Sequence, residues 1–366
     1  MDKRYKILHV SHGGLGNGGV SAVINSITAN LCAEYQFGCI VYTKHCNREE
    51  EFSRHGIIHR IDAYNSHNKF TKLVELIKRP FNLTIGTYRI CKKGQYDIIH
   101  CHNGWESAFC LIGAWLAGVK KRIAHAHNPI IKSGNPAKNI FITITSWLIN
   151  IFSTHRIGCS EGACETSFSK SYKVIYNAID LSKFTWDDKA TDKIQFIHVG
   201  RFGYPKNQNF VIDIFNELNK LRSNIQLNLI GFGPHSEIDL LSSKIKEFNL
   251  ESKINILDGT KENIANAFAQ SHYMIFPSSF EGFGIVILEA QASGVHCFVS
   301  ENIPDITNMG LWEKIELCKG ARYWAQIISN RIQNGQLNKK QYVLENLIQF
   351  DIKVVAKHYK AIYDAK

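Results

Sequence analysis

The sequence predicts an α/β protein with two doubly wound parallel sheets, one in each half of the chain. In both halves, apolar segments with strand character alternate with segments of helical spacing, which is typical of parallel sheets covered by helices. The polar stretch DLSKFTWDDKATDK at residues 180–193 interrupts this alternation. A chain of 366 residues is also long for a single core. We therefore expect two domains, residues 1–180 and residues 181–349.

The first domain opens with a strand, a glycine loop, a helix and a second strand, as YKILHV, HGGLGNGGV, VSAVINSITANLCAEY and GCIVYTK indicate. Further strands are expected at residues 56–61, 96–102, 121–127, 153–158 and 172–175. The apolar segments 108–119 and 140–152 fall short of the ~20 residues that span a bilayer, so both are predicted to be core helices. The helical segment 350–366 is expected to pack back on this domain.

The second domain restarts the alternation at residue 194. Its strands are expected at residues 194–199, 225–231, 254–257, 273–276 and 296–300, and its helices at 208–221, 235–248, 263–270 and 284–293. Ligands of doubly wound sheets bind beyond the carboxyl ends of the strands. Two such sheets facing each other across a cleft would share one site.

Charge and cysteine content limit the possible partners and compartment. Residues 1–184 hold 23 Lys and Arg against 12 Asp and Glu, which accounts for the whole net charge of +11. Such a half suits nucleic acid, anionic lipid or a phosphorylated substrate, or is a solvated basic face. The cysteines form no CxxC pair, and several lie in apolar runs, so reduced core thiols are expected. The start MDKRYKILHV is no signal peptide, and we expect a cytoplasmic protein.

The glycine loop HGGLGNGGV formally matches the dinucleotide fingerprint at Gly14, Gly16 and Gly19. That fingerprint requires an acidic residue after the second strand, where this chain has Thr43-Lys44-His45, so NAD is rejected. A glycine loop before a helix still exposes backbone amides to a phosphate or sugar oxygen. The alternative is a tight turn without a ligand.

In the second domain, HVGRFGYPKNQ places Arg201 and Lys206 directly after the first strand. An Arg fork and a Lys point charge together can neutralise a diphosphate at a strand end. Two solvated surface cations are the alternative.

The segment FPSSFEGFGIVILEAQASG contains two carboxylates, Glu281 on the expected loop and Glu289 inside the expected helix. Gly284 lets the backbone come close to a ligand, and the amides near Phe283 and Gly284 point out of the helix start as anion donors. Glu289 can accept hydrogen bonds from a polyol such as ribose. Two plain surface carboxylates would fit the apolar run 285–288 poorly.

Two histidine pairs, His100 with His102 and His125 with His127, alternate along strands, so each pair shares one face of the sheet. No acidic cluster or DxD pair accompanies them, and we expect no metal site. For His127 alone, a satisfied histidine at a strand end is the alternative to a ligand contact.

These segments resemble the retaining nucleotide-sugar glycosyltransferases of family 4, which have the GT-B fold. The carboxylate pair spaced E-x7-E, with EGFG and EAQASG around it, is similar to the family's motif, and so are VGRFGYPKNQNF, VIYNAIDLSKF, LIGFGP and GNGGV. IIHCHN followed by RIAHAHN is similar to the subgroup that builds bacterial surface polysaccharides. Ala178 departs from the family's usual glycine, which leaves the role of that loop open.

The resemblance implies a hexosyltransferase whose catalytic residues are His127, Glu281, Arg201 and Lys206. Arg201 and Lys206 would hold the donor diphosphate, Glu281 the transferred sugar, and His127 the donor sugar near its reacting carbon. The remaining donor-binding positions would be Gly18 and Gly19 at the phosphates, the amides of Phe283 and Gly284, and Glu289 at the ribose. The resemblance further implies a UDP-linked donor, no cofactor or metal, and retention. Retention could proceed by double displacement or by same-face attack guided by the leaving phosphate, and same-face attack is favoured because the sequence shows no unambiguous nucleophile.

The basic segment 68–93 interleaves cations with apolar residues, which suits an anionic membrane surface or a lipid diphosphate acceptor as well as a solvated helix. Together with this segment, the resemblance implies a growing, lipid-linked capsule or exopolysaccharide chain as the acceptor and a peripheral position on the inner membrane face. Two other functions compete. A GT-B nucleotide-sugar epimerase shares the architecture but is not expected to carry E-x7-E, and a basic nucleic-acid-binding protein lacks a zinc, helix-turn-helix or aromatic RNP pattern.

Overall fold

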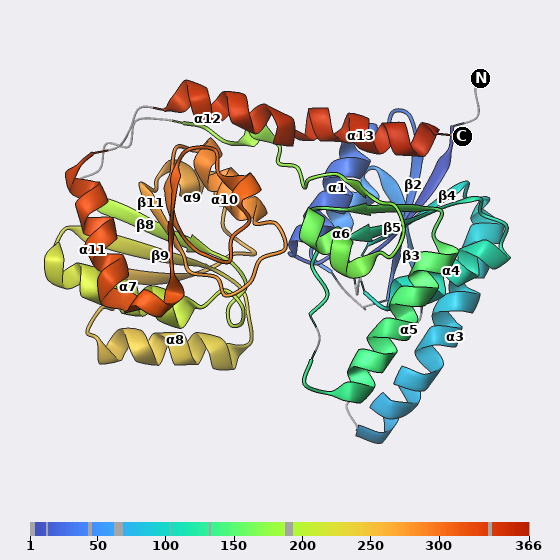
Figure 1. Ribbon diagram of the computed structural model, residues 1–366, viewed down its shortest axis with the longest axis horizontal. Helices are drawn as coiled ribbons and strands as arrows, with labels where there is room; N and C mark the ends of the chain where they lie inside the picture. Colours follow the sequence, from blue (N-terminus) through green and yellow to red (C-terminus); the bar gives the residue numbers. More distant parts are fainter. Residues whose placement is uncertain are drawn as a thin grey trace. The chain divides into compact units, whose positions relative to one another are not determined.

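A computed structural model describes residues 4–11, 14–42, 46–61, 69–102, 104–131, 133–186, 193–335 and 339–365, with the side chains of 69–77 left out. The chain divides into two compact units (Figure 1). Unit 1 comprises residues 1–178 and 352–366, and unit 2 comprises residues 179–351. Thr43-Lys44-His45, the side chains of Lys69 and Lys72, and residues 187–192 of the expected linker lie outside the described part.

Unit 1 contains a seven-stranded, wholly parallel sheet in the order β3-β2-β1-β4-β5-β6-β7. Its strands are β1 Lys6–Val10, β2 Gln36–Val41, β3 Gly56–Arg60, β4 Ile98–His102, β5 Lys121–Ala126, β6 His155–Gly158 and β7 Lys173–Val174. Its helices are α1 Gly19–Leu31, α2 Glu49–Ser53, α3 Lys69–Gly94, α4 Glu106–Leu116, α5 Pro136–Phe152, α6 Glu161–Ser167 and α13 Ile352–Asp364. The central strands β1 and β4 are buried almost throughout, as expected of a sheet covered on both faces.

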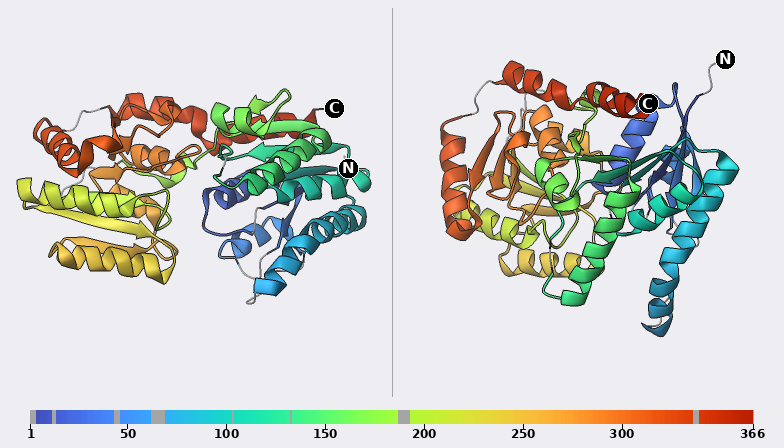
Figure 2. Two further views of the ribbon diagram at one scale, coloured as in Figure 1. Left: turned by 60° about the horizontal axis from the view of Figure 1, so that its bottom comes forward. Right: turned by 45° about the vertical axis from the view of Figure 1, so that its right-hand side comes forward.

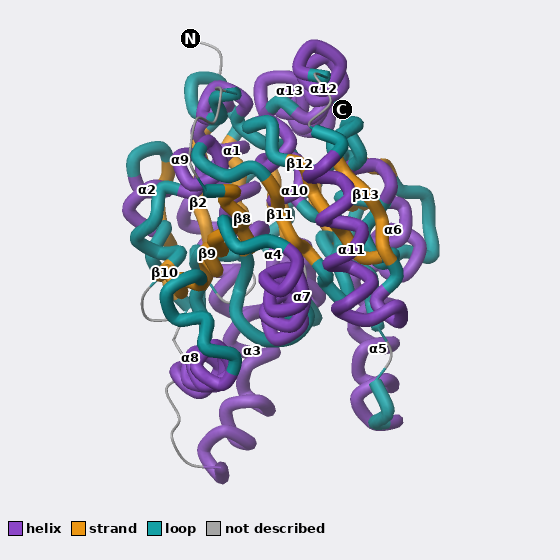
Figure 3. The backbone as a smooth tube through the Cα atoms, turned by 90° about the vertical axis from the view of Figure 1, so that its left-hand side faces the viewer, coloured by secondary structure: helices purple, strands orange, loops and turns teal. Residues whose placement is uncertain are grey.

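Unit 2 contains a six-stranded parallel sheet in the order β10-β9-β8-β11-β12-β13, which Figure 3 shows from left to right. Its strands are β8 Ile194–Val199, β9 Ile225–Gly231, β10 Ile254–Asp258, β11 Tyr273–Phe276, β12 His296–Ser300 and β13 Trp312–Ile315. Its helices are α7 Gln208–Leu221, α8 His235–Glu247, α9 Ile264–Ala269, α10 Ile285–Ala292, α11 Gly320–Gln333 and α12 Lys340–Leu347. Two doubly wound parallel sheets are thus confirmed.

The apolar faces of helices cover each sheet. In unit 2, the core between the sheet and α7 and α11 is built around Phe196, Phe215 and Trp324, all without exposed surface. In unit 1, α13 packs against α1 and buries Tyr359 and Tyr363. The carboxyl-terminal helix therefore completes the core of unit 1, although 173 residues of unit 2 precede it in the chain.

One of the two predicted core helices is confirmed and the other is wrong. Ala108, Cys110 and Leu111 on α4 are fully buried. On α5, however, the buried residues are Thr145 and Asn150, whereas the large apolar side chains Ile140, Phe141, Ile144, Trp147 and Ile151 are exposed. The reason is that, among the described helices of unit 1, only α4 makes extensive contacts with α5. In Figure 2, α3 and α5 reach beyond the strands of their unit. Within the described residues, none of the helices combines the length and the apolar character needed to cross a membrane.

Candidate functional site

The loop after β8 in unit 2 brings Lys206 back over the start of the loop. A Cβ atom at Gly200 would lie 3.1 Å from Lys206 Cγ, so the lysine stem occupies the space that a side chain at 200 would need. Gly203 has φ +100°, a conformation that favours glycine, and Asn207 enters α7 in the left-handed region. The loop therefore directs the ammonium group toward the end of β11.

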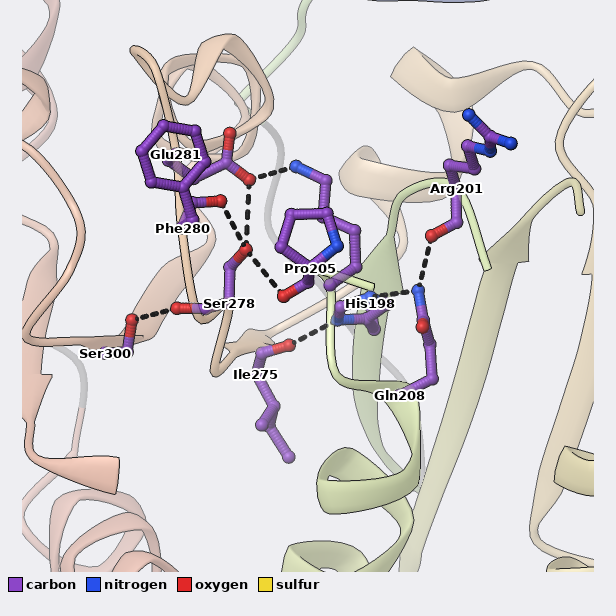
Figure 4. Close-up of polar contacts among 10 residues, drawn as sticks. His198, Arg201, Pro205, Gln208, Ile275, Ser278, Phe280, Glu281 and Ser300 are labelled. Atoms are coloured by element: carbon purple, nitrogen blue, oxygen red, sulfur yellow. Dashed lines mark hydrogen bonds and ion pairs between the residues drawn. The ribbon is translucent and has the colours of Figure 1, made fainter. Parts of the chain in front are cut away.

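Lys206 and Glu281 form an ion pair at the centre of this region (Figure 4). Their side chains are only 19% and 11% exposed, so both charges are largely withdrawn from water. Lys206 Nζ also lies 4.9 Å from the centroid of the Phe276 ring, a cation–π contact. Ser278 Oγ lies 3.2 Å from the paired oxygen of Glu281. A partly buried lysine is thus neutralised by the carboxylate that the sequence analysis assigned to sugar binding.

Arg201 is held through its backbone rather than its side chain. Gln208 Nε2 donates to the Arg201 carbonyl at 2.9 Å and lies 3.2 Å from His198 Nε2, while the Gly203 amide donates to Gln208 Oε1 at 3.0 Å. His198 Nδ1 lies 2.9 Å from the Ile275 carbonyl, so this nitrogen carries the proton and Nε2 accepts. Burial lowers the pKa of His198 to about 4, and the ring is neutral at pH 7.

The guanidinium of Arg201 is exposed, and among the described residues no ion pair or hydrogen bond involves it. Figure 4 shows it directed away from Glu281. Arg201 can therefore meet an anionic ligand without first giving up a protein partner. His198 and Gln208, which fix its backbone, were missed by sequence reasoning. A polar residue between apolar neighbours near the end of a strand, as His198 is between Ile197 and Val199 in β8, is the signal that could have found His198.

The loop from Pro277 to Gly284 ends in the start of α10, as predicted. Gly284 has φ +91° and ψ 48°, a left-handed conformation, and α10 begins at Ile285. Phe283 is buried, and its side chain anchors the loop in the interior of the protein. Glu289 lies in the second turn of α10 and is partly exposed. The helix start, with its unsatisfied amides and positive dipole end, therefore follows Glu281 by only four residues.

Hydrogen bonds hold the two loops of unit 2 together independently of the ion pair. The Ser279 amide donates to the Pro205 carbonyl at 2.9 Å, and Asn207 Nδ2 donates to the Pro277 carbonyl at 3.3 Å. Ser300 Oγ donates to the Ser278 carbonyl at 2.5 Å. The predicted residues Arg201, Lys206, Glu281, Phe283 and Gly284 thus belong to adjoining loops at the carboxyl edge of one sheet, and Glu289 follows them in α10.

Unit 1 carries the remaining predicted residues. Gly18 is the N-cap of α1 and Gly19 its first residue, and both are exposed. A Cβ atom at Gly18 would meet nothing within 4 Å, so no internal packing demands glycine there. The open backbone at this helix start is what a phosphate-binding loop requires.

His127 directly follows β5 and is buried among other histidines. Both predicted pairs face one side of the sheet, as expected, and His9 from β1 joins them. Burial lowers the pKa of His127 to about 3, with the Asn177 side chain partly opposing this effect. Two sets, His9 with His100 and His102 and His102 with His125 and His127, have nitrogens within 4.8 Å of one another. The absence of a metal site therefore stays a prediction.

Comparisons with known proteins show the family to which the chain belongs. Residues 17–183 match Glycosyltransferase Family 4, and residues 183–308 match Glycosyl transferases group 1. The Staphylococcus aureus capsular polysaccharide biosynthesis glycosyltransferase CapH is 26% identical to this chain. The aligned region covers 99% of this chain and 99% of CapH. The Escherichia coli UDP-Gal:α-D-GlcNAc-diphosphoundecaprenol α-1,3-galactosyltransferase is 28% identical, covering 62% of this chain and 63% of its own.

The crystal structure of Anabaena HepE in complex with UDP-glucose superposes with a TM-score of 0.79 at 16% identity, covering 98% of this chain and 100% of HepE. At this identity, the likeness shows the shared GT-B fold. With a family 4 domain followed by a group 1 domain, the chain belongs to the GT-B glycosyltransferases, in the group that includes capsular-polysaccharide enzymes.

Proposed function

We propose that this glycosyltransferase moves a hexose or N-acetylhexosamine from a UDP-linked donor to a growing, lipid-linked bacterial surface glycan, with retention and without a metal. The observation that carries the proposal is the Lys206–Glu281 ion pair beside the α10 start and Arg201. The printed names of the relatives support the coarser part, since one refers to capsular polysaccharide and another to a UDP-sugar and a diphosphoundecaprenol acceptor.

Donor binding would exchange the partner of Lys206. At rest, the ammonium group is neutralised by Glu281. A diphosphate offers a stronger, doubly charged partner for Lys206 and Arg201, and Glu281 is then released to accept hydrogen bonds from sugar hydroxyls. Glu289 would bind the ribose, and the amides of Phe283 and Gly284 the sugar or phosphate. In unit 1, Gly18 and Gly19 would bind the phosphates, and His127 the donor sugar.

The transfer step needs positive potential where charge grows on the departing diphosphate. Arg201, Lys206 and the dipole of α10 supply it from fixed positions, which is the large electrostatic contribution in such reactions. With the donor bound, Glu281 would accept hydrogen bonds from sugar hydroxyls, and Ser278 Oγ lies 3.2 Å from one of its oxygens, so we assign it to sugar binding rather than to nucleophilic attack. We therefore propose same-face attack of the acceptor hydroxyl, guided by the leaving phosphate.

The donor and the metal requirement can be tested together. A panel of UDP-, GDP-, ADP- and TDP-linked sugars is screened for thermal stabilisation of the full chain and for hydrolysis of the donor. We expect stabilisation by UDP-sugars and undiminished turnover in excess EDTA. Stabilisation by another nucleotide alone would overturn the UDP assignment, and loss of turnover in EDTA would overturn metal independence. The configuration of the product, determined by NMR of the anomeric proton, tests retention.

A surface on unit 1, which we call the α3–α5 surface, suits the membrane that would carry a lipid-linked acceptor. Its exposed apolar residues are Phe81, Ile85 and Tyr88 on α3, Trp115 and Leu116 on α4, and Ile140, Ile144, Trp147 and Ile151 on α5. The four on α5 recur at helical spacing and form one face. Exposed cations lie on the same two helices: Lys78, Arg89, Lys92 and Lys93 on α3, and Lys138 on α5. An amphipathic aromatic face with cations is typical of interfacial binding to anionic lipid.

Liposome flotation at low salt tests this contact. We expect binding to vesicles with anionic lipid and weaker binding to neutral vesicles. Trp147→Ser should weaken the binding, whereas the matched control Leu240→Ser, an equally exposed apolar residue on α8 of unit 2, should not. Absence of the wild-type chain from anionic vesicles would remove the proposed contact.

A further inference from the structure

A buried polar network lies against the loop that carries Arg201. Its members are His198, near the end of β8, and Gln208, the first residue of α7; His198 has no exposed surface and Gln208 is 2% exposed. Gln208 Nε2 lies 2.9 Å from the Arg201 carbonyl and 3.2 Å from His198 Nε2, and Gln208 Oε1 lies 3.0 Å from the Gly203 amide. The network thus ties β8 and α7 to two backbone positions of one loop.

The backbone of β11 determines the direction of every hydrogen bond in this network. The Ile275 carbonyl, 2.9 Å from His198 Nδ1, can only accept, so Nδ1 carries the proton of the neutral ring and Nε2 is an acceptor. Gln208 must then turn its NH2 group toward His198. The second N–H of this group reaches the Arg201 carbonyl, and the amide oxygen accepts from the Gly203 amide. A reversed amide would place its oxygen against two acceptors and its NH2 group against a donor.

The peptide group between Arg201 and Phe202 is held on both sides. Its carbonyl accepts from Gln208 Nε2, and its N–H, the Phe202 amide, donates to the Phe232 carbonyl at 2.8 Å. Figure 4 shows the Arg201 carbonyl directed toward Gln208 and the guanidinium extending away from Gln208. The negative end of this peptide group therefore faces a buried donor, while the positive side chain of the same residue is exposed.

Lys206, the other cation of the loop, is directed by different contacts. Its amide donates to the Gly203 carbonyl at 2.9 Å, but its ammonium group is paired with Glu281. The Ser279 amide, on the second loop, fastens the preceding residue by donating to the Pro205 carbonyl at 2.9 Å. The side chain of Lys206 therefore depends on the second loop, whereas the backbone of Arg201 depends on His198 and Gln208.

We propose that His198 and Gln208 are positioning residues for the donor diphosphate, because they fix the backbone from which Arg201 reaches the phosphates. This inference rests on the proposed contact between Arg201 and the diphosphate. A guanidinium that is exposed takes its position from the backbone that carries it. Without the network, donor binding would have to order this backbone. Ordering one residue corresponds to about 5- to 30-fold in Kd.

A purely structural network is the alternative, because a buried amide needs hydrogen-bond partners wherever it lies. Loss of Gln208 would then lower stability without acting selectively through Arg201. Gln291 on α10 offers a matched comparison. It is also fully buried, its Nε2 donates to the Thr307 carbonyl at 2.7 Å, and its Oε1 accepts from the Met309 amide at 2.9 Å.

Double-mutant cycles on the full chain test the proposal, with UDP binding measured by isothermal titration calorimetry. Gln208→Met removes the amide and keeps the length of the side chain. We expect it to raise the Kd for UDP about 5- to 30-fold in the wild type and in Lys206→Met, but no more than about twofold in Arg201→Ala. Equal losses in all three backgrounds, or no loss in the wild type, would refute the positioning role. Gln291→Met should lower the urea midpoint but leave the Kd within twofold; a loss of affinity equal to that of Gln208→Met would show a general structural effect.

His198→Phe perturbs the network from its other end. It keeps a ring against Phe276 and removes the acceptor for Gln208. We expect weaker UDP binding in the wild-type background but not in Arg201→Ala, and this variant decides if Gln208→Met does not fold. Hydrogen exchange of residues 200–204, followed by mass spectrometry without ligand, should be faster in either variant than in wild type. Unchanged exchange would refute the claim that the network fixes the loop.

The outcomes separate this inference from the proposed function. Wild-type UDP affinity in Arg201→Ala would overturn the proposed contact itself. Weaker binding in Arg201→Ala, combined with an additive effect of Gln208→Met, would overturn only the positioning role. If the wild-type chain does not bind UDP, the UDP assignment fails, and inorganic pyrophosphate takes its place in the same cycles.

Discussion

Substitution of Glu281 by Gln should tighten UDP binding while it slows sugar transfer. The variant keeps the shape of the side chain and its proximity to Ser278 but removes the negative charge paired with Lys206. Under the proposed exchange of partners, the diphosphate would have to displace Glu281 from Lys206 in the wild type, whereas in the variant Lys206 would be available at once. Transfer should suffer because a neutral amide binds sugar hydroxyls less strongly than a carboxylate does.

The size of both effects follows from the burial of the pair. Exposed ion pairs are worth roughly 0.2–1 kcal/mol, and breaking fully buried ones costs about 3–5 kcal/mol. With side chains 19% and 11% exposed, Lys206 and Glu281 lie between these limits. Relief of about 1.4 kcal/mol corresponds to a tenfold lower Kd for UDP. Loss of charge-assisted hydrogen bonds to the sugar, about 1–3 kcal/mol, corresponds to roughly 5- to 150-fold in kcat.

Isothermal titration calorimetry with UDP and a single-turnover transfer assay measure the two effects separately. Glu237→Gln is the matched control, because the Glu237 carboxyl lies near Gly203 of the same loop and is not part of the Lys206 ion pair. The control should change neither quantity beyond twofold. A Glu281→Gln variant that binds UDP more weakly than wild type, or transfers sugar at the wild-type rate, would refute the exchange of partners at Lys206.

Three further predictions concern affinity and stability. Lys206→Met should weaken UDP binding by about 10- to 100-fold in calorimetry, since one charge-assisted contact to the diphosphate is lost; unchanged affinity would contradict that contact. Gly284→Ala should destabilise unit 2 by about 1–2 kcal/mol in urea unfolding, because alanine is strained at φ +91°. The chain should also lose stability as the pH falls below about 6.5. Burial lowers the pKa of His9 and His127 to about 3, so the unfolded chain binds more protons there. Urea unfolding at pH 5 should show about 2 kcal/mol less stability per histidine than at pH 7.

Most strands, and the loop and helix that carry Glu281 and Glu289, could be predicted because short stretches of sequence determine them. Buried parallel strands are continuous apolar runs, and Gly284 marks the helix start. The Lys206–Glu281 pair could not be predicted, since it joins residues 75 positions apart. His9 likewise lies 93 residues from His102 and carries no motif of its own. The sequence pattern alone predicts that α5 is a core helix, because the sequence of a strongly apolar helix does not show which of its faces a neighbouring element covers.

The two units hold their buried polar groups in different ways, and this difference suits different tasks. In unit 2, a charged pair bridges two loops whose backbones are already fastened by the Ser279 amide and the Ser300 hydroxyl. Lys206 can therefore change its partner while the loops stay in place. In unit 1, the buried histidines His9, His102 and His127 are neutral and hydrogen-bonded to one another, so no charge is available there for exchange. A charged ligand would thus meet an exchangeable ion pair in unit 2 and a neutral, fixed polar cluster in unit 1.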